Sequence, residues 1–163
     1  MKTIYLAGGC FWGTQKFFDQ FDGVLETTVG YANGKKENPT YEVVCNDSGH
    51  AETVKVIYDE TKISTSEILD YYFMVIDPTS INKQGGDTGI QYRTGIYYKD
   101  ESLIEDIRLA VSKEQEKYDI PLAVEVKPLE SFYDAEEYHQ KYLDKNPGGY
   151  CHISPKLMNL KRS

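Results

Sequence analysis

Residues 3–13 are Thr3-Ile4-Tyr5-Leu6-Ala7-Gly8-Gly9-Cys10-Phe11-Trp12-Gly13, and this stretch decides the fold. The apolar and β-branched residues 3–7 predict a strand, which the Gly8-Gly9 pair interrupts. Phe17, Phe18 and Phe21 then recur at helical spacing, so we expect a helix over about residues 13–21. Cys10 therefore lies where a strand turns into a helix.

This position favours a reactive Cys10. Backbone N–H groups without intrahelical partners and the positive end of the helix dipole stabilise a thiolate, which is the nucleophilic form of cysteine. The alternative is a buried structural thiol, as is common for an intracellular cysteine. Phe11 and Trp12 directly follow Cys10 and favour a lined pocket over that alternative.

The rest of the chain predicts an α+β fold. Residues 24–31 and 52–58 have the β-branched content and alternation of strands. Ser64-Thr65-Ser66-Glu67 has the pattern of a capping box and predicts a helix that stops before Pro78. The later elements expected are a strand over 92–98, a helix over 101–118, a strand over 122–126 and a helix over 135–144. The order β-α-β-β-α-β predicts a split-βαβ sheet with helices mainly on one face.

Size and charge narrow the class of protein. The chain has 163 residues, which suits a single domain over 1–163, and a formal net charge of −8. Such acidity argues against binding nucleic acid or an anionic membrane, since both need clustered Lys and Arg. We expect neither a membrane segment nor a signal peptide, and therefore a cytoplasmic protein. Three cysteines are an odd number, so each is inert, a ligand or reactive.

Glu52 and His50 form a second group, in a glycine-containing turn that leads into a strand. A carboxylic acid that is partly buried at such a junction can donate a proton near neutral pH. The alternatives are a solvated charge for Glu52 and a structural turn histidine for His50. Spacing alone favours both alternatives.

Asp87 and Tyr92 lie in or beside a glycine-rich loop over residues 84–93. This loop has neither the Lys-Ser/Thr pair of a P-loop nor a dinucleotide fingerprint. Cys151 follows Gly148-Gly149, where it could approach another thiol and form a disulfide, or be a free surface thiol. Cys45 lies in an alternating apolar stretch, and we expect it to be packed.

Two other classes of protein have suitable residues. A cysteine hydrolase or acyl transferase could use Cys10 with His50 or His139, but it would not explain Trp12 or Cys151. A metal-binding module could use the three cysteines and His152, but no paired ligand spacing supports a metal site.

Five motifs together resemble the A-type peptide-methionine sulfoxide reductases. They keep their order over nearly the whole chain. The motifs are Gly9-Cys10-Phe11-Trp12-Gly13, Asn38-Pro39-Thr40-Tyr41, Gly49-His50-Ala51-Glu52, Gly89-Ile90-Gln91-Tyr92-Arg93 and Gly149-Tyr150-Cys151. The resemblance implies a two-layer α/β sandwich with a split-βαβ (ferredoxin-like) core and a coil-rich C-terminal segment.

The resemblance also implies a reaction, the reduction of the S epimer of methionine sulfoxide, free or in oxidised proteins. Cys10 would attack the sulfoxide sulfur, and Phe11 and Trp12 would line the pocket for the S-methyl group. Glu52 would protonate the sulfoxide oxygen. Two hydroxyls, those of Tyr41 and Tyr92, would assist, and Asp87 would order this network.

Recycling is likewise implied by the resemblance. Cys151 would form a disulfide with the oxidised Cys10, and thioredoxin, or dithiothreitol in vitro, would reduce it. The expected protein is a monomer without a bound cofactor.

Overall fold

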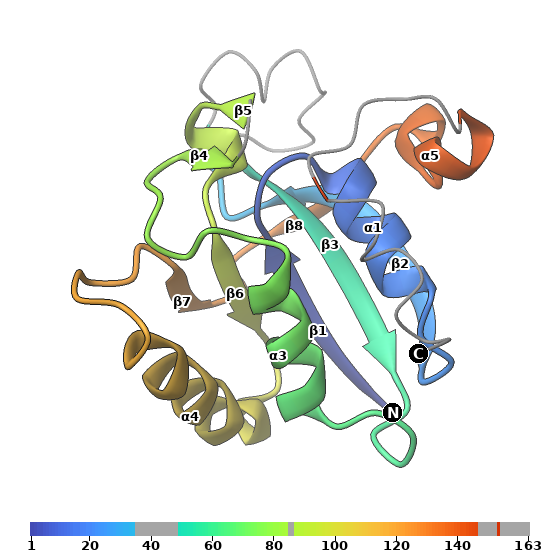
Figure 1. Cartoon of the computed structure of the whole chain (residues 1–163). Helices are drawn as coiled ribbons and strands as arrows, with labels where there is room; N and C mark the ends of the chain where they lie inside the picture. The colour runs from blue at the N-terminus through green and yellow to red at the C-terminus, as the bar shows by residue number, and fades with distance from the viewer. Residues whose placement is uncertain (35–48, 85–86, 147–152, 154–163) are drawn as a thin grey trace.

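Six strands form one mixed sheet in the computed structural model, which describes residues 1–34, 49–84, 87–146 and 153 (Figure 1). The strands of this sheet are β1 (Lys2–Ala7), β2 (Val24–Ala32), β3 (Ala51–Tyr58), β6 (Gly95–Tyr98), β7 (Glu125–Pro128) and β8 (Phe132–Asp134). A separate two-stranded hairpin contains β4 (Lys83–Gln84) and β5 (Asp87–Thr88). The α-helices are α1 (Phe11–Asp19), α3 (Thr65–Met74), α4 (Ile104–Gln115) and α5 (Tyr142–Lys145), and the 3-10 helices are η1 (Ile90–Tyr92), η2 (Glu101–Leu103) and η3 (Glu137–His139).

The strand order is β7-β6-β1-β3-β2-β8. Strand β3 is antiparallel to β1 on one side and to β2 on the other, and β6 is antiparallel to β1. Strands β1 and β2 therefore point the same way. As a result the last residues of β1 and β2 meet the first residues of β3 and β6 at one end of the sheet.

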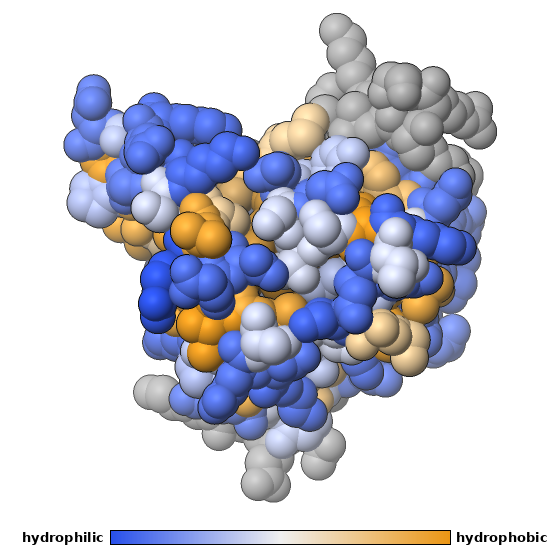
Figure 2. Space-filling model, turned by 90° about the horizontal axis from the view of Figure 1, so that it is seen from below, coloured by the Kyte–Doolittle hydropathy of each residue, from blue (hydrophilic) through white to orange (hydrophobic). Residues whose placement is uncertain are grey.

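Helices α1, α3 and α4 lie on one face of the sheet, in front of it in Figure 1. The main apolar core lies on this face, and its largest fully buried side chains include Tyr31, Tyr58, Phe17, Phe18, Ile68 and Leu69. A smaller buried cluster contains Tyr5 and Tyr97 and packs against Leu129 and Phe132. Figure 2, which views the end far from the start of α1, shows a largely hydrophilic surface with scattered apolar patches.

The structure confirms the α+β class and the capping box. The backbone N–H of Glu67 donates to Ser64 Oγ (3.0 Å), and the N–H of Ser64 donates to Glu67 Oε1 (3.1 Å). Two of the orphan donors at the start of α3 are thus satisfied by side chains. The expected strands over 24–31 and 52–58 correspond to β2 and β3.

Several expected boundaries are wrong. Helix α1 begins at Phe11, two residues early, because Gly9 adopts a left-handed φ of 75° and completes the turn before Cys10. Tyr92 belongs to η1, and the strand starts only at Gly95. The strand expected over 122–126 lies at Glu125–Pro128, since the N–H groups of residues 122 and 123 bond to Gln115 and Pro78 instead.

The two remaining helices also differ from expectation. The helix over 101–118 begins as the 3-10 turn η2, and its α-helical part ends at Gln115. The helix expected over 135–144 is wrong, because β8 ends at Asp134 and is followed by η3 and the four-residue α5. Between those two helices Gln140 is extended and Lys141 is left-handed (φ 56°), so no continuous helix can form.

The hydroxyl of Tyr72 in α3 forms hydrogen bonds with the end of β1 and the start of β6, beneath the turn at Gly8. Its fully buried hydroxyl donates to the carbonyl of Ala7 (2.6 Å) and accepts from the N–H of Gly95 (3.1 Å). A Cβ at Gly8 would lie 2.5 Å from Ile76 Cγ2, so this turn packs closely on the segment after α3. One phenol therefore joins the end of β1 to the start of β6.

We expect Tyr72→Phe to lower the free energy of unfolding by about 1–3 kcal/mol, because it leaves two buried backbone groups without their partner. Urea unfolding at neutral pH measures this loss. The matched control is Tyr71→Phe, since Tyr71 is half-buried and stacks on Phe21 through its ring (4.2 Å between centroids). A loss as large in the control would contradict the role given to the Tyr72 hydroxyl.

Candidate active site at the start of helix α1

Cys10 occupies the N-cap position of α1. Its backbone is extended (φ −68°, ψ 128°), and the helix begins at the next residue. Its side chain is buried, with 6% exposed. The N–H of Gly9 donates to the carbonyl of Tyr92 (3.2 Å), which fixes the turn before the cysteine. Cys10 therefore lies at the positive dipole end of α1, which favours a thiolate.

Glu52 lies at the same helix start. It is the second residue of β3 and only 1% exposed, and its Oε1 accepts a hydrogen bond from the N–H of Phe11 (3.2 Å). The alternative of a solvated strand-end charge is thus wrong. Because β3 runs between β1 and β2, the start of this strand lies in the middle of the sheet, next to the turn that follows β1.

Aromatic rings line the space around Cys10. The ring of Phe11 is buried, 5.8 Å from that of Tyr31 and 5.3 Å from that of His139. Trp12 is half-buried and stacks on Tyr142, with 3.8 Å between centroids and 12° between planes. Cys10 thus lies beside an apolar wall, part of which reaches the surface.

His139 supports this wall. The indole Nε1 of Trp12 donates a hydrogen bond to His139 Nδ1 (3.0 Å). His139 is 1% exposed, and burial lowers its pKa, although the nearby Glu136 carboxylate acts in the opposite direction. A bond to Trp12 at Nδ1 gives His139 a supporting role rather than that of a hydrolase base. The other histidine of that hypothesis, His50, is buried with its ring edge-on to Tyr133 (6.0 Å).

Tyr31 and Glu136 form a further buried pair. Tyr31 pairs with Glu52 in the β2–β3 register, and its hydroxyl donates to Glu136 Oε1 (2.8 Å). Burial, followed by the hydrogen bond to Glu136, raises the pKa of Tyr31 well above its ordinary value. Tyr31 is therefore a permanent hydrogen-bond donor at physiological pH.

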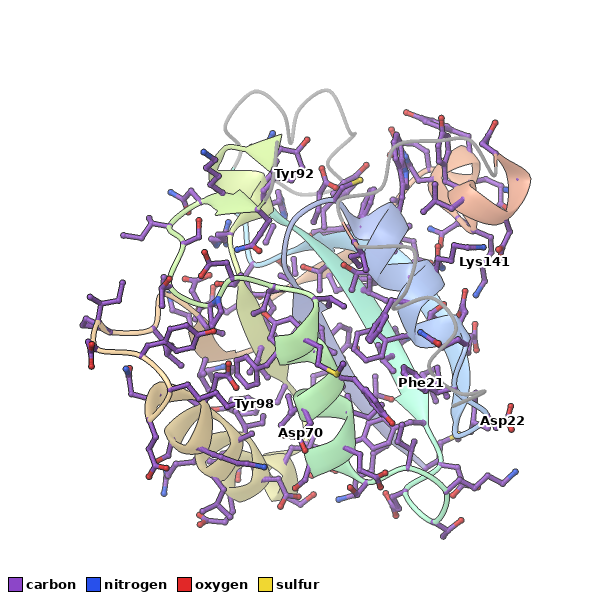
Figure 3. All side chains as sticks on the ribbon, in the orientation of Figure 1. Phe21, Asp22, Asp70, Tyr92, Tyr98 and Lys141 are labelled. Atoms are coloured by element: carbon purple, nitrogen blue, oxygen red, sulfur yellow. The ribbon has the colours of Figure 1, made fainter. Side chains whose placement is uncertain are left out.

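The segment after β8, which carries His139, is attached to β2 and α1 by side-chain hydrogen bonds. The amide of Gln140 both accepts from the N–H of Val29 (3.0 Å) and donates to its carbonyl (2.9 Å). The N–H of Lys141 donates to Gln15 Oε1 (2.8 Å), and its ammonium group contacts Asp19 Oδ2 (2.7 Å). Figure 3 shows Lys141 below α5 and beside α1.

The structure describes only some of the other expected site residues. Tyr92 is half-buried at the end of η1, at the same end of the sheet as the start of α1 (Figure 3). Asp87 belongs to strand β5, which pairs with β4. Tyr41 and Cys151 lie outside the described residues, as does Cys45.

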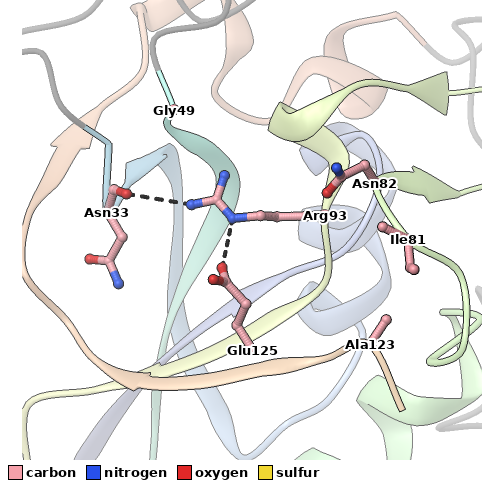
Figure 4. A pocket seen from close by; sticks show the side chains of 7 residues that line it. All are labelled: Asn33, Gly49, Ile81, Asn82, Arg93, Ala123 and Glu125. Atoms are coloured by element: carbon pink, nitrogen blue, oxygen red, sulfur yellow. Dashed lines mark hydrogen bonds and ion pairs between the residues drawn. The ribbon is translucent and has the colours of Figure 1, made fainter. Parts of the chain in front are cut away.

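A partly buried ion pair lies at the neighbouring part of the sheet, between Arg93 and Glu125 (Figure 4). Arg93 Nε lies 2.6 Å from Glu125 Oε1, and an Arg93 Nη atom donates to the carbonyl of Asn33 (3.4 Å). Burial raises the pKa of Glu125, but hydrogen bonds from Arg93, Tyr97 and Lys127 outweigh it and lower this pKa to about 2. Arg93, Glu125 and Asn33 line a pocket of about 370 Å³ that also contacts Gly49.

The structure brings Cys10, Phe11, Trp12 and Glu52 together, as the motifs predict. Sequence reasoning missed Tyr31, Glu136 and Tyr142, and considered His139 only as a base. A tyrosine in a strand has no distinguishing pattern. Glu136, His139 and Tyr142 lie within the helix expected over 135–144, which does not form. Within the described ranges no three His, Cys, Asp or Glu side chains form a metal-binding group. No helix in that part of the chain is long and apolar enough to cross a membrane.

Comparison with known proteins gives a consistent result. The family model described as peptide methionine sulfoxide reductase matches residues 2–163. A curated peptide methionine sulfoxide reductase MsrA from Lachnoclostridium phytofermentans is 63% identical over 153 residues, covering 93% of this chain and 92% of the relative. The MsrA of Clostridium acetobutylicum is 58% identical over 159 residues, covering 97% and 98%.

Solved structures agree with these relatives. The crystal structure of reduced Mxr1 from Saccharomyces cerevisiae has a TM-score of 0.88 and 40% identity, covering 94% of this chain and 91% of that one. Methionine sulfoxide reductase A of Corynebacterium diphtheriae has a TM-score of 0.82 and 37% identity, covering 92% and 77%. A structure of the yeast protein in complex with Trx2 has a TM-score of 0.62 and 28% identity, covering 86% and 84%.

Proposed function

The chain belongs to the peptide methionine sulfoxide reductase family, and from this premise we propose that Cys10 is the nucleophile that reduces methionine S-sulfoxide. One observation carries the proposal: Cys10 and the carboxylate of Glu52 share the N-terminus of α1, where Glu52 accepts the N–H of Phe11. A nucleophilic thiol and a proton carrier are thus adjacent.

The reaction needs both groups. The Cys10 sulfur attacks the sulfoxide sulfur while Glu52 donates a proton to the sulfoxide oxygen, which is a poor leaving group until it is protonated. The S–O bond then breaks and the hydroxyl passes to the Cys10 sulfur. The new bond between the two sulfurs breaks at the same time, and methionine leaves with the electron pair of that bond. The thiol becomes a sulfenic acid and the sulfoxide becomes a thioether, so one two-electron oxidation balances one two-electron reduction.

The neighbouring residues bind the substrate. Phe11 and Trp12 form an apolar wall beside Cys10, which suits the S-methyl group. We assign to the hydroxyls of Tyr41 and Tyr92 the role of donors to the sulfoxide oxygen, and to Asp87 the ordering of that network. The half-buried position of Tyr92 at the cysteine end of the sheet supports its part.

Cys151 resolves the oxidised enzyme in this proposal. Its thiol attacks the sulfenic sulfur of Cys10, releases water and forms a disulfide. Thioredoxin then reduces the disulfide, and no bound cofactor is needed. The existence of a complex between the structurally similar Mxr1 and Trx2 supports this partner.

We also propose a single domain over residues 1–163 with a split-βαβ core. Support comes from the four strands β6-β1-β3-β2, in which β3 separates the parallel strands β1 and β2 that α1 connects. A monomeric enzyme is part of this proposal. A thiol that must be regenerated suits the reducing cytoplasm.

The first prediction concerns the nucleophile. Cys10→Ser should abolish dithiothreitol-driven reduction of a methionine sulfoxide peptide, because a hydroxyl at this position is not ionised near neutral pH. Methionine formation, followed by chromatography, measures the activity. Near-UV circular dichroism should be unchanged, and activity that survives the substitution would refute the mechanism.

The second prediction concerns the proton donor. Glu52→Gln retains an oxygen that can accept from the N–H of Phe11, but its amide cannot transfer a proton. We expect kcat to fall more than about tenfold while KM changes little. The control is Glu26→Gln, at an exposed carboxylate on β2. A single-turnover rate equal to that of the wild type would exclude Glu52 as the acid.

The third prediction concerns recycling. Cys151→Ser should still form one equivalent of methionine without an added thiol, because the first step needs only Cys10. Its thioredoxin-driven turnover should be lost, since no disulfide with Cys10 forms. Steady-state turnover with thioredoxin at the wild-type rate would instead show that Cys151 takes no part.

A further inference from the structure

The wall of the proposed substrate pocket depends on a hydrogen bond between distant parts of the chain. Trp12 is the second residue of α1, and its indole N–H donates to Nδ1 of His139, 127 residues later (3.0 Å). Tyr142 covers the other side of the indole by stacking on it (3.8 Å). The residues that hold Trp12 therefore lie on a segment that no motif of the sequence analysis includes.

The hydrogen bond requires a neutral His139. An imidazole nitrogen that accepts must carry a free lone pair, so the ring proton lies on Nε2. In the imidazolium form both nitrogens carry hydrogen, and Nδ1–H would face the indole N–H. Two donors then oppose each other at hydrogen-bond distance, and the Trp12 contact is lost.

The groups packed around His139 permit it to be neutral near pH 7. Phe11 and Trp12 of α1 contribute only uncharged rings, and the ring of Tyr138 lies 4.1 Å from that of His139 on its own segment. Glu136 is the nearby carboxylate on that segment, and the Tyr31 hydroxyl of β2 donates to it. Glu52 of β3 is paired in register with Tyr31. Burial outweighs the effect of Glu136 and lowers the pKa of His139 from 6.5.

We propose that His139 is a positioning residue that holds Trp12 against the substrate methyl group, and that protonation of His139 on acidification releases Trp12 and weakens substrate binding. The proposal rests on the proposed function, in which Trp12 lines the substrate pocket. It deepens that function, because it makes substrate affinity at this site dependent on pH through a residue that does not react.

Tryptophan fluorescence tests the contact directly, since Trp12 is the single tryptophan of the chain. Between about pH 7.5 and about pH 4.5 the emission of the wild type should change reversibly, with a midpoint below 6.5. In His139→Asn the side-chain oxygen takes the place of Nδ1 and accepts at every pH, so this transition should vanish. A transition that persists in His139→Asn, or its absence from the folded wild type, would overturn the proposal.

Substrate binding provides the second readout. We use Cys10→Ser as the background, because it binds a methionine sulfoxide peptide without turning it over. Affinity should fall about fivefold on acidification, as expected for the loss of one hydrogen bond. It should remain constant when His139→Asn is added. His139→Leu should bind about fivefold more weakly at neutral pH and show no pH dependence.

Trp12→Phe supplies the matched control, since it keeps an aromatic ring but has no N–H. In this variant affinity should not respond to His139→Leu or to pH. A response as large as in the wild type would mean that His139 acts by another route, and would refute its role through Trp12. The fluorescence titration uses no substrate, so its result does not depend on the proposed reaction. Failure of the role given to His139 can therefore be distinguished from failure of the proposed function.

Discussion

The hydrogen bond from the N–H of Phe11 to Oε1 of Glu52 is the contact on which the site depends. It joins the start of α1 to the start of β3, and so places a carboxylate beside the thiol of Cys10. The Cys10 thiol can carry negative charge as a thiolate, and the positive dipole end of α1 stabilises that charge. Burial of both side chains excludes water, which strengthens each of these interactions.

The order of the strands makes this contact possible. Because β3 lies between β1 and β2, the residues that end β1 and begin β3 are neighbours although 41 positions separate Phe11 from Glu52. The local part of this arrangement could be predicted from the sequence, including the strand-to-helix turn at Cys10 and the capping box at Ser64. The burial of Glu52 could not, because spacing along the chain does not reveal which strands flank a residue.

The C-terminal part shows why the helix expected over 135–144 was wrong. Residues near 135–144 have a helical pattern, yet the left-handed Lys141 interrupts them, because its N–H and ammonium group bond to Gln15 and Asp19 of α1. Tertiary hydrogen bonds thus override local propensity. His139 and Tyr142 owe their places at the site to this irregular segment, so no periodic signal in the sequence could reveal them. Their contacts with Trp12 are visible only in three dimensions.

The attachment of this segment has a consequence for biosynthesis. A ribosome makes Cys10 and Trp12 early, but His139 and Tyr142 follow only after about 130 more residues, at roughly 5–20 residues per second. During those seconds the nascent chain carries its thiol without the rings that hold the indole in place. The aromatic wall beside Cys10 is assembled last, when the late segment docks on α1. Its completion is therefore tied to completion of the chain rather than to formation of the sheet.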